Sequence, residues 1–149
     1  MLVYLSDLAH DYFKVNQYTP TGVGYLAAYA QSKLKKQVEF RLFKSVTKLL
    51  NAYEKRKPDL IGFSNYTWNN ALSKFAGQWI KQRDPLLPII MGGPNIRTYR
   101  KGIEEFLRVN EYVDTYCMFA GEISLYEILK FLLEQSKDKR TSKILRGHT

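Results

Sequence analysis

Short runs of β-type residues alternate along the chain with longer stretches whose apolar residues recur at helical spacing. The expected strands are residues 2–5, 38–43, 60–64, 88–92 and 115–119. Parallel strands need a crossover of about a dozen residues between them, and a helical pattern of that length follows each expected strand. The pattern therefore predicts a parallel sheet with helices packed on both of its faces.

Two local signals indicate where helices begin. Pro20 follows Thr19 and suits the first turn of a helix that extends to about Leu34. Ser124 and Glu127 have the spacing of a capping box at the start of the last helix. Because crossovers are right-handed, few arrangements remain, and we expect an α/β, flavodoxin-like three-layer sandwich with a five-stranded parallel sheet of order 2-1-3-4-5.

Size and composition are those of a single folded domain. The chain has 149 residues, of which 45% are hydrophobic. We expect residues 1–135 to form this domain and residues 136–149 to be a basic linker or a disordered tail, since that stretch lacks helical periodicity. The tail carries +4 of the formal net charge of +9. Because so much of the charge lies in the tail, nucleic acid is not the expected partner.

The location of the protein and its metal chemistry are also constrained. No apolar stretch approaches the roughly 20 residues that span a bilayer, and the first residues lack a basic leader, so we expect a cytoplasmic protein without membrane contact. The single cysteine, Cys117, lies in an expected buried strand, where a thiol is normally inert. With only His10 and His148 besides, a metal would have to arrive inside a cofactor.

Four segments follow expected strands and meet at the carboxyl edge of the sheet, where open α/β sheets bind ligands. The first, residues 6–19, is much longer than a usual βα connection and is interpreted as a binding loop. No residue is predicted to be catalytic. The residues expected to bind a cofactor are Asp7, His10, Ser64, Asn65, Tyr66, Gly92, Gly93, Pro94, Gly121 and Glu122.

Two of these segments admit a second interpretation. Gly92 and Gly93 end an apolar run, and two residues without Cβ open a slot that a flat or bulky ligand can enter. The alternative is a tight turn that precedes Pro94. After the third strand, polar and aromatic side chains are able to hydrogen-bond and stack against a ring system. The alternative there is that Asn69 caps the next helix and Trp68 covers the core.

Other cofactor patterns fail on position. Residues 22–27 match the dinucleotide pattern G-x-G-x-x-A, but in that fold the first glycine directly follows the first strand, and here more than a dozen residues intervene. A phosphorylated receiver domain needs an aspartate at the end of the third strand, where this chain has Ser64. Neither function is therefore expected.

Taken in order, several segments resemble the cobalamin-binding domain at the amino end of many radical S-adenosylmethionine enzymes. They are residues 7–10, 20–29, 58–64, 91–94 and 121–122, so the resemblance covers about residues 1–135. It implies that cobalamin is the cofactor and that Ser64 lies along its nucleotide tail. It also implies that Gly92 and Gly93 let this tail pass beside the sheet.

The loop after the first strand departs from the wider cobalamin-binding family. That family carries Asp-x-His-x-x-Gly, whose histidine replaces the dimethylbenzimidazole base below cobalt. Here two residues separate Asp7 from His10, and Lys14 and Val15 stand where a glycine is sought. This departure favours cobalamin bound base-off, without a protein ligand or with a weak one, over cobalt ligation by His10.

The chemistry of the resembling enzymes also needs a three-cysteine motif that holds a 4Fe-4S cluster, and this chain has one cysteine. The resemblance implies a cobalamin-binding module that is not catalytic alone. Its partner would be a radical domain of the parent polypeptide, a methyltransferase or a related radical enzyme, which holds the cluster and S-adenosylmethionine. The alternative is a flavodoxin-like regulatory or interaction domain that has lost cofactor binding.

Overall fold

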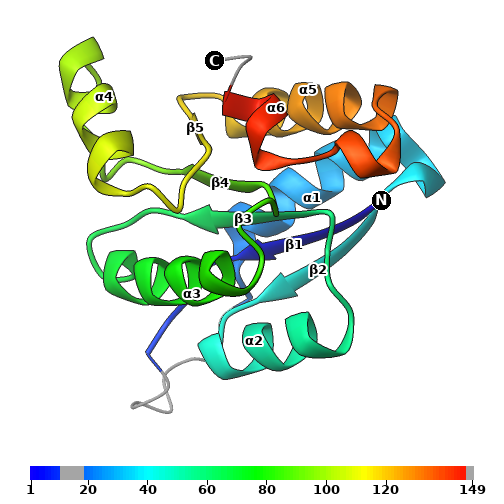
Figure 1. The fold of residues 1–149 in the computed structure, drawn as a ribbon, viewed down its shortest axis with the longest axis horizontal. Coiled ribbons are helices and arrows are strands. Elements are labelled where there is room, and N and C mark those ends of the chain that lie inside the picture. Colours follow the sequence, from blue (N-terminus) through cyan, green and yellow to red (C-terminus); the bar gives the residue numbers. More distant parts are fainter. Residues whose placement is uncertain (11–18, 147–149) are drawn as a thin grey trace.

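The computed structural model describes residues 1–10 and 19–146 (Figure 1). Its five strands form one parallel sheet of order β2-β1-β3-β4-β5, which confirms the predicted fold class and strand order. Each expected strand is present, with bounds that differ from the prediction by at most two residues. The strands are β1 (Leu2–Ser6), β2 (Glu39–Phe43), β3 (Leu60–Ser64), β4 (Ile89–Gly92) and β5 (Thr115–Cys117).

Helices follow the strands. The last long helix begins at Gly121 rather than at the predicted capping box, because Ser124 lies inside its first turn and donates its hydroxyl to the Ala120 carbonyl at 3.2 Å. No helix in the described ranges is long and apolar enough to cross a membrane. The helices are α1 (Thr21–Leu34), α2 (Val46–Lys55), α3 (Asn70–Arg83), α4 (Arg100–Val109), α5 (Gly121–Glu134) and α6 (Ser142–Arg146), with short 3-10 helices at Lys35–Gln37 and Lys137–Lys139.

Two apolar clusters cover the two faces of the sheet. Successive strand residues point to opposite faces, so Val3 and Leu5 pack on one side while Leu2 and Tyr4 pack on the other. The first face is covered by α1 and α5, and the second by α2 and α3 (Figure 1). The helices on the first face leave the carboxyl ends of the central strands uncovered, and this is where the site lies.

Residues 136–146 differ from the linker or disordered tail that their composition suggests. In α6, Leu145 is 3% exposed and belongs to the apolar cluster on the α1 and α5 side. Arg146 pairs with the fully buried carboxylate of Asp114 at 2.8 Å, and Lys81 pairs with the same carboxylate at 2.8 Å. The packing combines Ile144 and Leu145, the buried Ser142 and one ion-pair cluster within a five-residue helix, so it produces no periodic pattern in the sequence.

Candidate functional site

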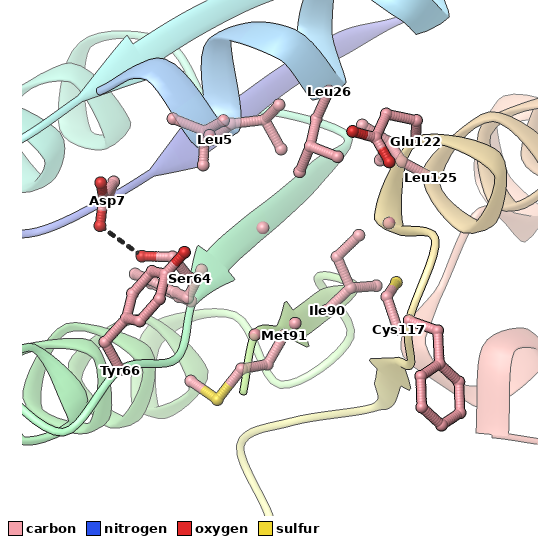
Figure 2. Close-up of a pocket in the computed structure, with 18 residues that line it drawn as sticks. Leu5, Asp7, Leu26, Ser64, Tyr66, Ile90, Met91, Cys117, Glu122 and Leu125 are labelled. Carbon is pink, nitrogen blue, oxygen red and sulfur yellow. Dashed lines mark hydrogen bonds between the residues drawn. The ribbon is translucent and has the colours of Figure 1, made fainter. Parts of the chain in front are cut away.

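A pocket of about 220 Å³ opens at the carboxyl ends of the central strands, between the first turns of α1 and α5 (Figure 2). Its walls come from segments far apart in the sequence, as expected where a parallel sheet presents its carboxyl edge. Seven of the ten predicted site residues line it. They are Asp7, Ser64, Tyr66, Gly92, Gly93, Gly121 and Glu122.

The other three predicted residues do not line the pocket. Asn65 is fully buried, and its amide nitrogen donates to the Asn95 carbonyl at 2.9 Å and to the Tyr116 hydroxyl at 3.0 Å, so it holds the loop after β4 in place. Pro94 lies exposed in that loop, and His10 is exposed beyond β1. The rest of the predicted binding loop, residues 11–18, and His148 lie outside the described residues.

A hydrogen-bonded triad forms the polar side of the pocket. The Ser64 hydroxyl donates to Asp7 Oδ1 at 2.7 Å, as Figure 2 shows. The amide of Asn69 donates to the same carboxylate oxygen at 3.1 Å and to Ser64 Oγ at 2.7 Å. Because Asn69 is fully buried, it fixes the orientation of both groups that face the pocket.

The two alternatives considered for the segment after β3 are wrong in detail. Asn69 stands at the N-cap position of α3, but its side chain makes no capping bond and instead accepts the Tyr66 N–H at 2.8 Å. Trp68 does not cover the core, since it is 62% exposed. Its ring stacks on that of Tyr66 with centroids 4.5 Å apart and an angle of 7°. The stacked pair holds Tyr66 at the pocket wall.

The apolar walls were not among the predicted site residues. Leu5, Ile90 and Leu125 face the pocket in Figure 2 and continue the core of the α1 and α5 face. Gly22 and Leu26 of α1 complete the wall, within the segment whose glycine pattern does not fit a dinucleotide site. The sequence signal that could have identified this wall is the same glycine pattern, because glycines at the start of a helix leave room for a ligand.

The backbone conformation at position 93 requires glycine, and Gly93 also lies in the pocket wall. Its φ of +131° lies in a region that side chains disfavour. A Cβ there would lie 2.6 Å from the Asn65 carbonyl oxygen, which also accepts the Asn95 N–H at 3.2 Å. The backbone conformation after β4 therefore requires glycine at position 93. At Gly92 the absence of a Cβ lets β5 approach closely, since a Cβ there would lie 3.2 Å from the Cys117 carbonyl oxygen.

The described ionisable groups of the pocket are one thiol, one phenol and two carboxylates. Burial raises the pKa of the Cys117 thiol to about 11, so the thiol stays protonated and unreactive at neutral pH. Asp7 and Glu122 are the acidic side chains of the wall, and none of the described residues that line it is a lysine or an arginine. No group of three or more potential metal ligands occurs among residues 1–10 and 19–146.

Comparisons with known proteins find similarity both in sequence and in structure. No family model matches the chain. A cobalamin-dependent radical SAM methyltransferase, TokK of Streptomyces tokunonensis, is 29% identical over 82 residues, which are 55% of this chain. The chain spans 12% of the length of that methyltransferase.

The structural matches share the fold at low identity. A cobalamin-binding protein from Desulfitobacterium hafniense DCB-2 matches with a TM-score of 0.63 and 12% identity over 87% of this chain and 58% of its own. NtrX from Brucella abortus, solved in complex with ADP, matches with a TM-score of 0.65 and 18% identity over 93% of this chain and 28% of its own. The chain is thus similar to a segment of a cobalamin-dependent radical SAM methyltransferase and has the flavodoxin-like fold of a cobalamin-binding protein.

Proposed function

We propose that this chain is the cobalamin-binding module of a radical S-adenosylmethionine enzyme and that its pocket holds the nucleotide tail of the cofactor. The observation that carries the proposal is the pocket itself, which lies between α1 and α5 at the carboxyl edge of the sheet. Its volume of about 220 Å³ is below the roughly 300–1,000 Å³ of sites for drug-sized ligands. Such a pocket suits one arm of a larger ligand better than a whole macrocycle.

The chemistry of the wall suits this tail. Leu5, Leu26 and Leu125 offer apolar surface to the aromatic base. Both α1 and α5 begin at the pocket, and the unpaired N–H groups of a first helical turn favour a phosphate. The carboxylates of Asp7 and Glu122 are acceptors for the many amide N–H groups that cobalamin carries at its edge.

The cofactor would supply the reactive cobalt, and the chain would supply its placement. We propose that the bound form is base-off without His10 as a cobalt ligand. The altered spacing of the histidine motif and the position of His10 outside the pocket wall support this. The Asp7, Ser64 and Asn69 triad would then serve to orient the Ser64 hydroxyl along the tail.

Catalysis is proposed to require a radical domain beyond this chain. A 4Fe-4S cluster needs three thiolates, and the single Cys117 carries a raised pKa because of its burial. The similarity to TokK over 12% of that methyltransferase supports a parent of the same class, with the cluster and S-adenosylmethionine held elsewhere. The basic groups near the carboxyl end are not proposed to bind nucleic acid.

Two phenylalanine substitutions test the proposal. A Cβ added at Gly22 or at Gly24 meets no atom within 4 Å, so both variants should fold, but only Gly22 lines the pocket. After incubation with hydroxocobalamin and desalting, the unsubstituted chain and Gly24→Phe should keep the absorbance of a bound base-off corrinoid. Gly22→Phe should retain at least about tenfold less, since its ring fills the mouth.

The same experiment separates the alternative function. The fold matches NtrX with a TM-score of 0.65, as well as it matches the cobalamin-binding protein, so the fold alone is equally compatible with a regulatory or interaction domain that has lost its cofactor. A colourless unsubstituted chain would favour that alternative. Equal retention by Gly22→Phe and Gly24→Phe would place the corrinoid outside the pocket.

A further inference from the structure

Phe119, which follows β5, has an unfavourable backbone conformation. Its φ is +54°, in the left-handed region where a bulky side chain is strained. Among the non-glycine residues of the described ranges, only Lys35 shares a positive φ, and Lys35 lies at the end of α1 that is opposite the pocket. Phe119 lies just before the start of α5, so the C-terminus of a helix does not explain its positive φ.

The side chain of Phe119 is unfavourably placed as well. Its ring is 89% exposed, more than any other large apolar side chain of residues 1–10 and 19–146. Glycine at this position would remove both the strain and the exposed ring. The fold therefore gains nothing from phenylalanine at this position, and strained residues of this kind concentrate at ligand sites.

Phe119 lies at the pocket. Phe119 lines the wall together with Cys117 and Glu122, whereas the exposed rings of Trp68 and Tyr99 do not. Because Phe119 is a wall residue with an exposed side chain, its ring is free to rotate toward a ligand seated in the pocket. An aromatic contact of this kind raises the affinity for the ligand roughly tenfold.

We infer that Phe119 is a ligand-positioning residue, whose ring packs on an apolar face of bound cobalamin at the pocket mouth and slows release of the cofactor. The inference rests on the proposed function and adds a specific residue to it. The strained backbone holds the start of the side chain at the mouth, so the ring needs only side-chain rotation to close over the ligand.

Phe119→Gly separates this role from a structural one. Relief of the left-handed strain should raise the melting temperature by roughly 2–4 °C. Release of hydroxocobalamin into excess competing apo-binder, followed by absorbance, should become about tenfold faster. A residue that merely supported the fold would show lower stability and faster release together, whereas here the two measurements move in opposite senses.

Two further variants act as controls. Lys35→Gly relieves the other positive φ at the far end of α1, about 20 Å away, and should leave the release rate unchanged. Phe119→Leu keeps both the strain and an apolar side chain and should release the corrinoid at an intermediate rate. An unchanged release rate in Phe119→Gly, or a lower melting temperature, would overturn the inference alone. Failure of the unsubstituted chain to retain hydroxocobalamin would overturn the proposed function and the inference with it.

Discussion

Truncation of Leu145 to alanine tests whether α6 belongs to the folded domain. The side chain is 3% exposed and packs in the cluster under α1 and α5. Removal of a buried leucine costs about 2–5 kcal/mol. We expect the free energy of unfolding to fall by about 2 kcal/mol, the low end of this range. The reason is that a short terminal helix can detach by itself, so the lost stability cannot exceed the free energy with which α6 docks on the domain. For a domain of this size the melting temperature should fall by roughly 4–8 °C.

Urea unfolding followed by circular dichroism measures the change, with Lys143→Ala as the control. Lys143 is exposed on the same helix, so its substitution should change the free energy of unfolding by less than about 0.5 kcal/mol. Indistinguishable stabilities of the two variants would refute the reasoning. In that case Leu145 would not be buried in solution, and residues 136–149 would be the linker or disordered tail expected from their composition.

Two further predictions concern the site. Gly93→Ala should destabilise the fold by roughly 1–3 kcal/mol because of the φ of +131° and the nearby Asn65 carbonyl, whereas Gly24→Ala in α1 should stabilise it by roughly 1 kcal/mol. Equal effects of the two substitutions in urea unfolding would contradict this account of the turn. Burial raises the pKa of Cys117 from 9.0 to about 11. The stability that the protonated thiol contributes to the fold is therefore complete below the unfolded pKa and is lost as the pH rises through the folded pKa. The loss should approach about 2.7 kcal/mol between pH 8.5 and 11.5, and Cys117→Ala, measured across the same range, should remove that part of the slope.

Much of the fold follows from local patterns. The strand β3 is a short apolar run bounded by polar residues, and α5 shows leucines at helical spacing, so both are predictable without tertiary information. The strand order follows because right-handed crossovers allow few arrangements. Residues that directly end strands, such as Ser64 and Gly92, could likewise be predicted to meet in one site, because parallel strands present their carboxyl ends at one edge.

Side-chain direction within the loops required the tertiary structure. Ser64 and Asn65 are adjacent and both polar, yet one faces the pocket and the other holds the loop after β4. Which of two neighbouring side chains faces a ligand depends on backbone angles set by distant contacts. The same reason applies to Phe119, whose left-handed backbone no local pattern indicates.

The sequence by itself determined the alternation of strands and helices, the parallel sheet and the edge at which a ligand site would form. Only the tertiary structure decided that α1 supplies a pocket wall and that α6 packs on the domain. The physical reason is that periodic burial leaves a repeated signal along the chain. A single buried leucine, a shared carboxylate such as Asp114, or a gap between two helix starts arises from contacts between distant segments and leaves no such repeat.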